Sequence, residues 1–123
     1  MEVIGYLVEF IKKQYNMYSL FIGRFQPLHK GHIKLIQKVL DEKKPVCVAL
    51  RDTLISEDNP FTVEQRKEMF NKEFGDKVKV IVIPDITEIC YGRKVGWGIR
   101  EIRLDENIEK ISSTNIRKKE EQL

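Results

Sequence analysis

The chain contains two histidines, His29 and His32, and they lie three positions apart with Gly31 between them. A glycine has no Cβ, so an anion can approach the backbone closely at this point. If a helix begins here, its free N–H groups and its dipole also favour negative charge. Two imidazoles can then donate hydrogen bonds to phosphoryl oxygens and stabilise the charge that builds up during group transfer. Arg24 and Lys30 add positive charge beside them.

Two simpler interpretations of the histidine pair stay open. His29 and His32 could be a loop residue and a surface helix residue without a chemical role. They could also bind a metal from one helical face, but the sequence offers no evident third ligand nearby. We therefore predict no metal site.

A second candidate segment, ISSTNIR, occupies residues 111–117. By itself it is typical of an ordinary serine N-cap. Three successive hydroxyl groups at a helix start, with Arg117 about one turn inside the helix, could equally hold the outer phosphates of a triphosphate. The two segments together favour phosphate binding.

The elements that must position these segments alternate along the chain. Three apolar runs are typical of strands buried in a parallel sheet: residues 18–22, 46–50 and 78–83. Helical spacing predicts one helix over about residues 31–42. A second helix should begin at Thr62, where Gln65 completes a capping box, and end at Gly75.

Strands that alternate with helices require parallel pairing and right-handed crossovers. The sequence therefore predicts an α/β fold, a Rossmann-like open parallel sheet flanked by helices. Ligands bind at the carboxyl ends of the strands in such sheets, where both candidate segments fall. Residues 85–98 are expected to form a long loop, residues 100–104 a fourth strand, and residues 112–123 a final charged helix.

Composition limits the class of protein. The 22 basic and 19 acidic residues are interleaved, so the net charge of +3 does not indicate nucleic acid as a partner. No apolar stretch has the length of a membrane span. Cys47 and Cys90 lie far apart, without zinc-ligand spacing, as expected for a reduced cytoplasmic protein. The expected partners are small molecules, with neither nucleic acid nor membrane among them.

The first sixteen residues lack the basic start and the small-residue cleavage site of a secretory signal. They could form an amphipathic helix or a short edge strand, or result from an upstream start codon, with the working domain beginning at Met17. We treat residues 1–16 as an N-terminal extension and residues 17–123 as the catalytic domain. The apolar extension is also a candidate contact for a homo-oligomer.

A family resemblance follows from these segments. Residues 23–32, GRFQPLHKGH, resemble the GRFQPxHxGH signature of the HxGH nucleotidyltransferase superfamily, and residues 111–117 resemble its ISSTxIR signature. The GRFQP form, together with residues 59–62 and Arg66, is most similar to archaeal-type nicotinamide-mononucleotide adenylyltransferases. The resemblance covers most of residues 17–119.

The resemblance implies transfer of a nucleoside monophosphate, AMP above all, from a nucleoside triphosphate to a phosphate acceptor such as nicotinamide mononucleotide. Pyrophosphate would leave, ATP would be the substrate, and Mg²⁺ would bind through the triphosphate. Two alternatives stay open: a cytidylyltransferase acting on a small phosphorylated alcohol, and a nucleotide-binding module without catalysis.

Site roles follow from the same resemblance. The residues expected to act in catalysis are basic side chains from both signatures: Arg24, His29, Lys30, His32 and Arg117. The residues expected to bind the nucleotide line the same two segments: Gly23, Phe25, Gln26, Gly31, Ser112, Ser113, Thr114 and Arg117.

The acceptor side departs from the archaeal-type pattern. The SGNP-containing stretch of those enzymes is missing, and residues 89–98 stand in its place. Tyr91 and Trp97 could stack on an acceptor ring and Arg93 could hold its phosphate, or the segment could be a glycine-rich loop with a packed tryptophan. Arg51 and Asp52 end the second strand and either line the acceptor pocket or form a solvent-exposed ion pair.

Overall fold

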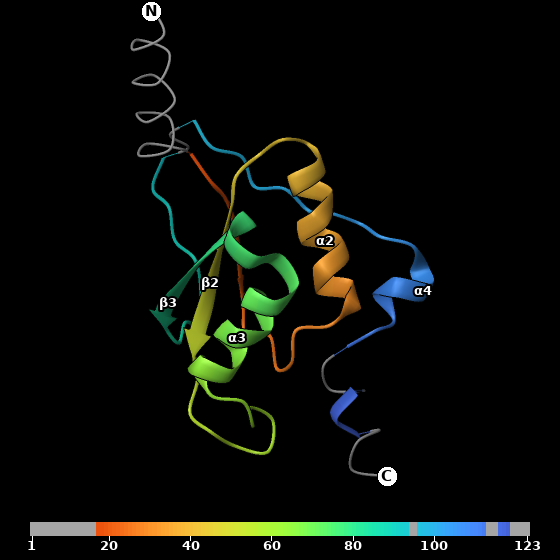
Figure 1. Ribbon diagram of the computed structural model, residues 1–123. Helices are drawn as coiled ribbons and strands as arrows, with labels where there is room; N and C mark the ends of the chain where they lie inside the picture. Colours follow the sequence, from red (N-terminus) through yellow and green to blue (C-terminus); the bar gives the residue numbers. More distant parts are fainter. Residues whose placement is uncertain (1–16, 94–95, 113–115, 119–123) are drawn as a thin grey trace, which may run out of the picture.

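The computed structural model describes residues 17–93, 96–112 and 116–118 (Figure 1). Its elements follow one another as β1 (Ser19–Gly23), α2 (Lys30–Asp41), β2 (Val46–Asp52), α3 (Val63–Phe74), a short 3₁₀ turn η1 (Gly75–Lys77), β3 (Val78–Pro84) and α4 (Glu106–Glu109). The strands pair in parallel in the order β1-β2-β3. The three expected strands and the two crossover helices are confirmed, and with them the α/β class.

The ends of α3 are fixed by the residues that the sequence singles out. Gln65 N donates to Thr62 Oγ1 at 3.1 Å, and Thr62 N donates to Gln65 Oε1 at 2.8 Å, so the capping box is complete. Gly75 ends the helix with a φ of 59°, a conformation that glycine adopts readily. No helix within the described ranges is long and apolar enough to cross a bilayer.

The hydrophobic core lies on one face of the sheet. It combines alternate residues of β2 with the inward faces of both crossover helices: Val46, Val48, Leu50, Ile36, Val39, Phe70 and Phe74. In Figure 1, α3 lies in front of the sheet and α2 lies to its right, and residues of both helices belong to the one core. Both crossover helices therefore flank the same face of the sheet. Because the strands follow one another in a single direction across the sheet, right-handed crossovers bring both helices to the same side.

The opposite face of the sheet carries the remaining alternate residues. Cys47 and Ala49 of β2 are buried there, while Leu20 of the edge strand β1 is 55% exposed. Neither crossover helix covers this face, because both belong to the core on the other side.

Strand register brings three chain segments to one edge of the sheet. Gly23 pairs with Leu50, and Asp52 pairs with Pro84, so the carboxyl ends of all three strands lie together. The residues that follow the strands therefore start from the same edge, which is where an open parallel sheet binds its ligands.

The predicted fourth strand at residues 100–104 is wrong, because this segment has no strand pairing in the structure. Ile102 packs beside the core, but the backbone is held elsewhere. Arg100 binds Glu42 at the end of α2 with two bonds of 2.7 and 2.6 Å. The N–H of Leu104 donates to the carboxylate of Glu109 rather than to a neighbouring strand.

The predicted final helix lies only partly within the described residues. Ile116 N donates to Ser112 O at 3.1 Å, and residues 116–118 are helical. Residues 119–123 lie outside the described ranges, as do residues 1–16 of the predicted N-terminal extension.

Candidate functional site

His29 and His32 form the N-terminal cap of α2. His29 Nδ1 accepts hydrogen bonds from Gly31 N at 3.0 Å and from His32 N at 3.4 Å. In return His29 N donates to His32 Nδ1 at 3.2 Å, so the two imidazoles complete a capping box. Because each Nδ1 accepts a hydrogen bond, the ring proton of each neutral imidazole must lie on Nε2. Both rings therefore keep one N–H group to donate to a ligand.

The two imidazoles are uncharged near neutral pH. Their rings stack with centroids 3.6 Å apart. Burial lowers the pKa of His29 below its usual value of 6.5. Burial, and secondarily the neighbouring His29, lower the pKa of His32 to about 3. The histidines thus offer hydrogen bonds rather than charge, and positive charge at this site must come from arginine and lysine.

Gly31 makes room for the His29 ring. A Cβ at this glycine would lie 2.8 Å from His29 Cε1, which is closer than any real contact of this kind, and 3.6 Å from Ile108 O. Gly31 itself is buried. Gly31 is therefore needed for the His29 ring to cap the helix. This role adds to the one expected from the sequence, which is to let a phosphate approach the backbone closely.

The Phe25 ring packs against the imidazole of His32. It adopts a φ of 50°, which is uncommon for a residue with a bulky side chain. Its buried ring meets His32 edge-on with centroids 4.7 Å apart and meets Phe70 of the core at 5.0 Å. Gly23 lies against the same ring, since a Cβ there would be 3.0 Å from it. The position of His32 is thus linked to the core through Phe25.

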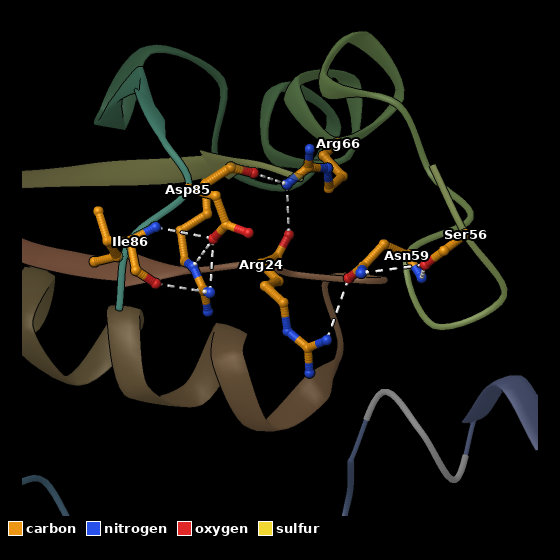
Figure 2. Close-up of polar contacts among 7 residues, drawn as sticks. Arg24, Ser56, Asn59, Arg66, Asp85 and Ile86 are labelled. Carbon is orange, nitrogen blue, oxygen red and sulfur yellow. Dashed lines mark hydrogen bonds and ion pairs between the residues drawn. The ribbon is translucent and has the colours of Figure 1, made fainter. Parts of the chain in front are cut away.

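The turn that carries Phe25 is tied to a distant loop. Gln26 is 1% exposed, and its side-chain amide exchanges two bonds of 2.9 Å with the backbone of Phe61. Arg24 donates to Asn59 Oδ1 at 3.2 Å (Figure 2). Expected as a nucleotide-binding residue, Gln26 therefore commits its side chain to holding the turn, and its backbone carbonyl accepts a bond from Arg117.

An open cavity of about 350 Å³ unites the two signature segments. It is lined by residues from the first turn, the helix cap and the distant segment: Arg24, Phe25, Gln26, His29, His32, Ile111 and Ser112. Ile111 and Ser112 thus lie beside the histidines although about eighty positions separate them in the chain. Lys30 is exposed and does not line the cavity, and Ser113 and Thr114 lie outside the described residues.

Arg51 forms an ion pair at the carboxyl edge of the sheet. Its Nε and Nη2 lie 2.8 and 2.7 Å from Asp85 Oδ1, and Nη2 also donates to Ile86 O at 3.2 Å. The hydrogen bond from Arg51 is the main cause that lowers the pKa of Asp85. Asp52 is exposed next to this pair, and neither Arg51 nor Asp52 lines the cavity. No sequence pattern pointed to Asp85, which lies 34 positions from its partner.

The loop that carries Tyr91, Arg93 and Trp97 lies away from the histidines. Tyr91, Arg93 and Trp97 line a small separate hollow together with Ile99, and the Tyr91 and Trp97 rings lie 6.3 Å apart. The chain continues to Arg100, which binds Glu42 at the carboxyl end of α2, opposite the His29 cap. In Figure 1 this part of the chain runs at the far end of the sheet. The structure does not bring the three residues to the cavity.

Comparison with known proteins identifies the class to which this fold and site belong. A family model described as cytidylyltransferase-like matches residues 20–90. The chain belongs to this cytidylyltransferase-like family. The matched range contains the histidine signature and ends before Ile111. The placement of Ile111 and Ser112 at the cavity is therefore known from the structure and not from the family match.

Individual relatives are adenylyltransferases. The chain is 35% identical over 78 residues to a nicotinamide-nucleotide adenylyltransferase of Thermococcus sibiricus, covering 57% of this chain and 42% of that protein. It is 39% identical over 60 residues to a nicotinamide/nicotinic acid mononucleotide adenylyltransferase of Acinetobacter baylyi, covering 47% of this chain and 32% of the relative. The chain thus spans less than half the length of these relatives.

A solved structure is also similar. It is a bifunctional NMN adenylyltransferase/ADP ribose pyrophosphatase from Francisella tularensis, complexed with AMP and a Mn ion. The match has a TM-score of 0.50 and 35% sequence identity, and it covers 56% of this chain and 23% of the other.

Proposed function

We propose that this chain binds ATP in the cavity at the amino end of α2 and transfers AMP to the phosphate of nicotinamide mononucleotide. The observation that carries the proposal is the shared cavity, in which Ile111 and Ser112 lie beside His29 and His32. The names of the relatives from Thermococcus sibiricus and Acinetobacter baylyi support the choice of acceptor.

The reaction needs no nucleophile from the protein. An oxygen of the acceptor's phosphate attacks the α-phosphorus of ATP and forms a new P–O bond. The bond from that phosphorus to the bridging oxygen of the β-phosphate breaks, and its electron pair leaves with pyrophosphate. Catalysis then consists of holding the two phosphates in line and stabilising charge on their oxygens.

The residues divide this task between neutral and charged donors. The Nε2–H groups of His29 and His32 would donate to phosphoryl oxygens in the transition state. Permanent charge would come from three basic side chains: Arg24, Lys30 and Arg117. The hydroxyls of Ser112, Ser113 and Thr114 would hold the outer phosphates, above a floor made by Gly23, Phe25, Gln26 and Gly31.

Magnesium enters as part of the MgATP substrate. Of the described residues, those that line the cavity include no carboxylate, which suits an ion held by phosphate oxygens rather than by a protein cage. The Mn ion in the similar Francisella structure supports a divalent ion in the reaction.

The acceptor side of the site is proposed at the carboxyl ends of β2 and β3. Arg51 and Asp52 lie at this edge, next to the residues that follow β1. A role for Tyr91, Arg93 and Trp97 would require the loop to move toward the cavity. We place the reaction in the cytoplasm, where thiols such as those of Cys47 and Cys90 stay reduced.

Pyrophosphate release tests the proposal. The purified chain is incubated with MgATP or MgCTP and either nicotinamide mononucleotide or glycerol 3-phosphate, and products are identified by mass. We expect turnover with ATP and nicotinamide mononucleotide, and a loss of about 10²- to 10³-fold in His32→Ala. Turnover with CTP and glycerol 3-phosphate would instead identify a cytidylyltransferase. Nucleotide binding without pyrophosphate release would identify a non-catalytic module.

A further inference from the structure

Arg66 is a buried arginine that links three elements. It is 0% exposed and projects from the first half of α3. Its Nη1 donates to Arg24 O and to Arg51 O, both at 2.8 Å, and its Nε donates to Thr62 O at 3.2 Å. Figure 2 shows its guanidinium directed at the Arg24 carbonyl. One side chain thus ties the end of β1 and the end of β2 to the start of α3.

Stability alone does not account for an arginine at this position. Burial lowers the pKa of Arg66, an effect that Asp52 only partly offsets. Among the described residues its buried Nη2 has no hydrogen-bond partner. Well-packed apolar side chains are often at least as stabilising as buried charged groups. What the guanidinium adds is a rigid planar set of donors that fixes two carbonyl groups relative to each other.

One of these carbonyls belongs to the turn that forms the cavity. Arg24 directly precedes Phe25, whose left-handed backbone and buried ring support His32. A shift of the Arg24 carbonyl would move the Phe25 backbone and, through the ring contact, the imidazole of His32.

We propose that Arg66 is a positioning residue for the triphosphate, which it never touches. It fixes the backbone of Arg24 and thereby the turn on which the nucleotide lies. This inference rests on the proposed function in one respect, namely that the cavity binds a nucleoside triphosphate.

The test compares two Arg66 variants with a matched control. Arg66→Met removes all three hydrogen bonds to carbonyl groups, and Arg66→Lys can keep one of them. Val78→Ala weakens the same core, but Val78 begins β3, six register positions from Pro84 at the carboxyl edge. Binding of MgATP is measured by calorimetry at a temperature where circular dichroism shows each variant folded, and kcat and KM are measured with nicotinamide mononucleotide.

We expect Arg66→Met to weaken MgATP binding about tenfold and to lower kcat about 10²-fold, because small displacements at a reacting centre have effects of this size. Arg66→Lys should lie between Met and wild type. Val78→Ala should lower Tm and leave the MgATP affinity unchanged. If Arg66 had a purely structural role, the two Arg66 variants would behave in the same way as this control.

Wild-type affinity and kcat in a folded Arg66→Met or Arg66→Lys variant would overturn the proposal. If neither variant folds, Arg66 is a structural residue and the proposal is equally overturned. Wild-type protein that binds MgATP without turning over nicotinamide mononucleotide would refute the proposed acceptor, while the binding comparison would still decide the role of Arg66. Absence of MgATP binding to the wild type would refute both.

Discussion

The two roles of His29, capping α2 and donating to phosphate, can be separated by a pair of substitutions. In His29→Ala the N–H groups of Gly31 and His32 lose their common acceptor, Nδ1. Loss of an N-cap acceptor costs about 1 kcal/mol. For a chain of this size that corresponds to a fall of about 4 °C in Tm. In His29→Asn the side-chain oxygen can accept from the same groups, so Tm should stay close to wild type.

Catalysis should respond differently from stability. Neither alanine nor asparagine can replace the Nε2–H group, which lies at the far side of the imidazole from the capping Nδ1. Both variants should therefore slow adenylyl transfer by about 10²- to 10³-fold, the usual effect of losing one preorganised donor. His29→Asn would be a stable protein with low activity, and His29→Ala a less stable protein with similarly low activity.

Thermal denaturation followed by circular dichroism and pyrophosphate release at saturating MgATP measure the two effects separately. A Tm for His29→Ala equal to that of wild type would refute the cap. A wild-type rate in His29→Asn would refute the imidazole as a phosphate donor, whatever its effect on the helix.

Two further predictions concern the same cap. Gly31→Ala should lower turnover by about tenfold or more, because its Cβ would lie 2.8 Å from His29 Cε1 and displace the ring. The control Gly98→Ala should be neutral, because a Cβ at Gly98 meets nothing within 4 Å. Equal rates in the two variants would contradict the steric conflict between a Cβ at Gly31 and the His29 ring. Since folding lowers the pKa of His32 from 6.5 to about 3, the unfolded state binds more protons between these values, and the free energy of unfolding should fall as pH falls from about 6.5 toward 5. Urea denaturation at several pH values measures this slope, which His32→Gln should reduce while keeping the capping-box bond, and an unchanged slope in that variant would count against the buried neutral imidazole.

Sequence patterns predicted the elements of this fold that are encoded locally. The α3 helix is an example, because Thr62, Gln65 and Gly75 specify its ends through contacts within a few residues. The predicted strand at residues 100–104 was wrong because a short local pattern does not determine whether the backbone finds a neighbouring strand. Ile102 does pack beside the core, but Arg100 holds the segment to α2.

The candidate site shows the same division. The histidine signature at a helix start could be predicted, and so could its closeness to Ile111 and Ser112. The supporting contacts could not, since Gln26 meets Phe61 across 35 positions and Arg66 meets Arg24 across 42. No spacing rule encodes such pairs, because they exist only once the strands have aligned. Roles for Ser113 and Thr114 stay predictions.

The segment that leads to the cavity residues Ile111 and Ser112 runs along one side of α2. Arg100 is anchored to the last turn of this helix, and Ile108 and Ser112 lie beside the first turn. The twelve-residue helix is about 18 Å long, whereas the twelve residues 100–111 could extend to about 40 Å. The connecting segment is therefore longer than the distance it must span, and α4 shortens it. Insertions or deletions of a few residues between Arg100 and Ile108 should change the path of this segment and leave Ile111 and Ser112 in place at the cavity.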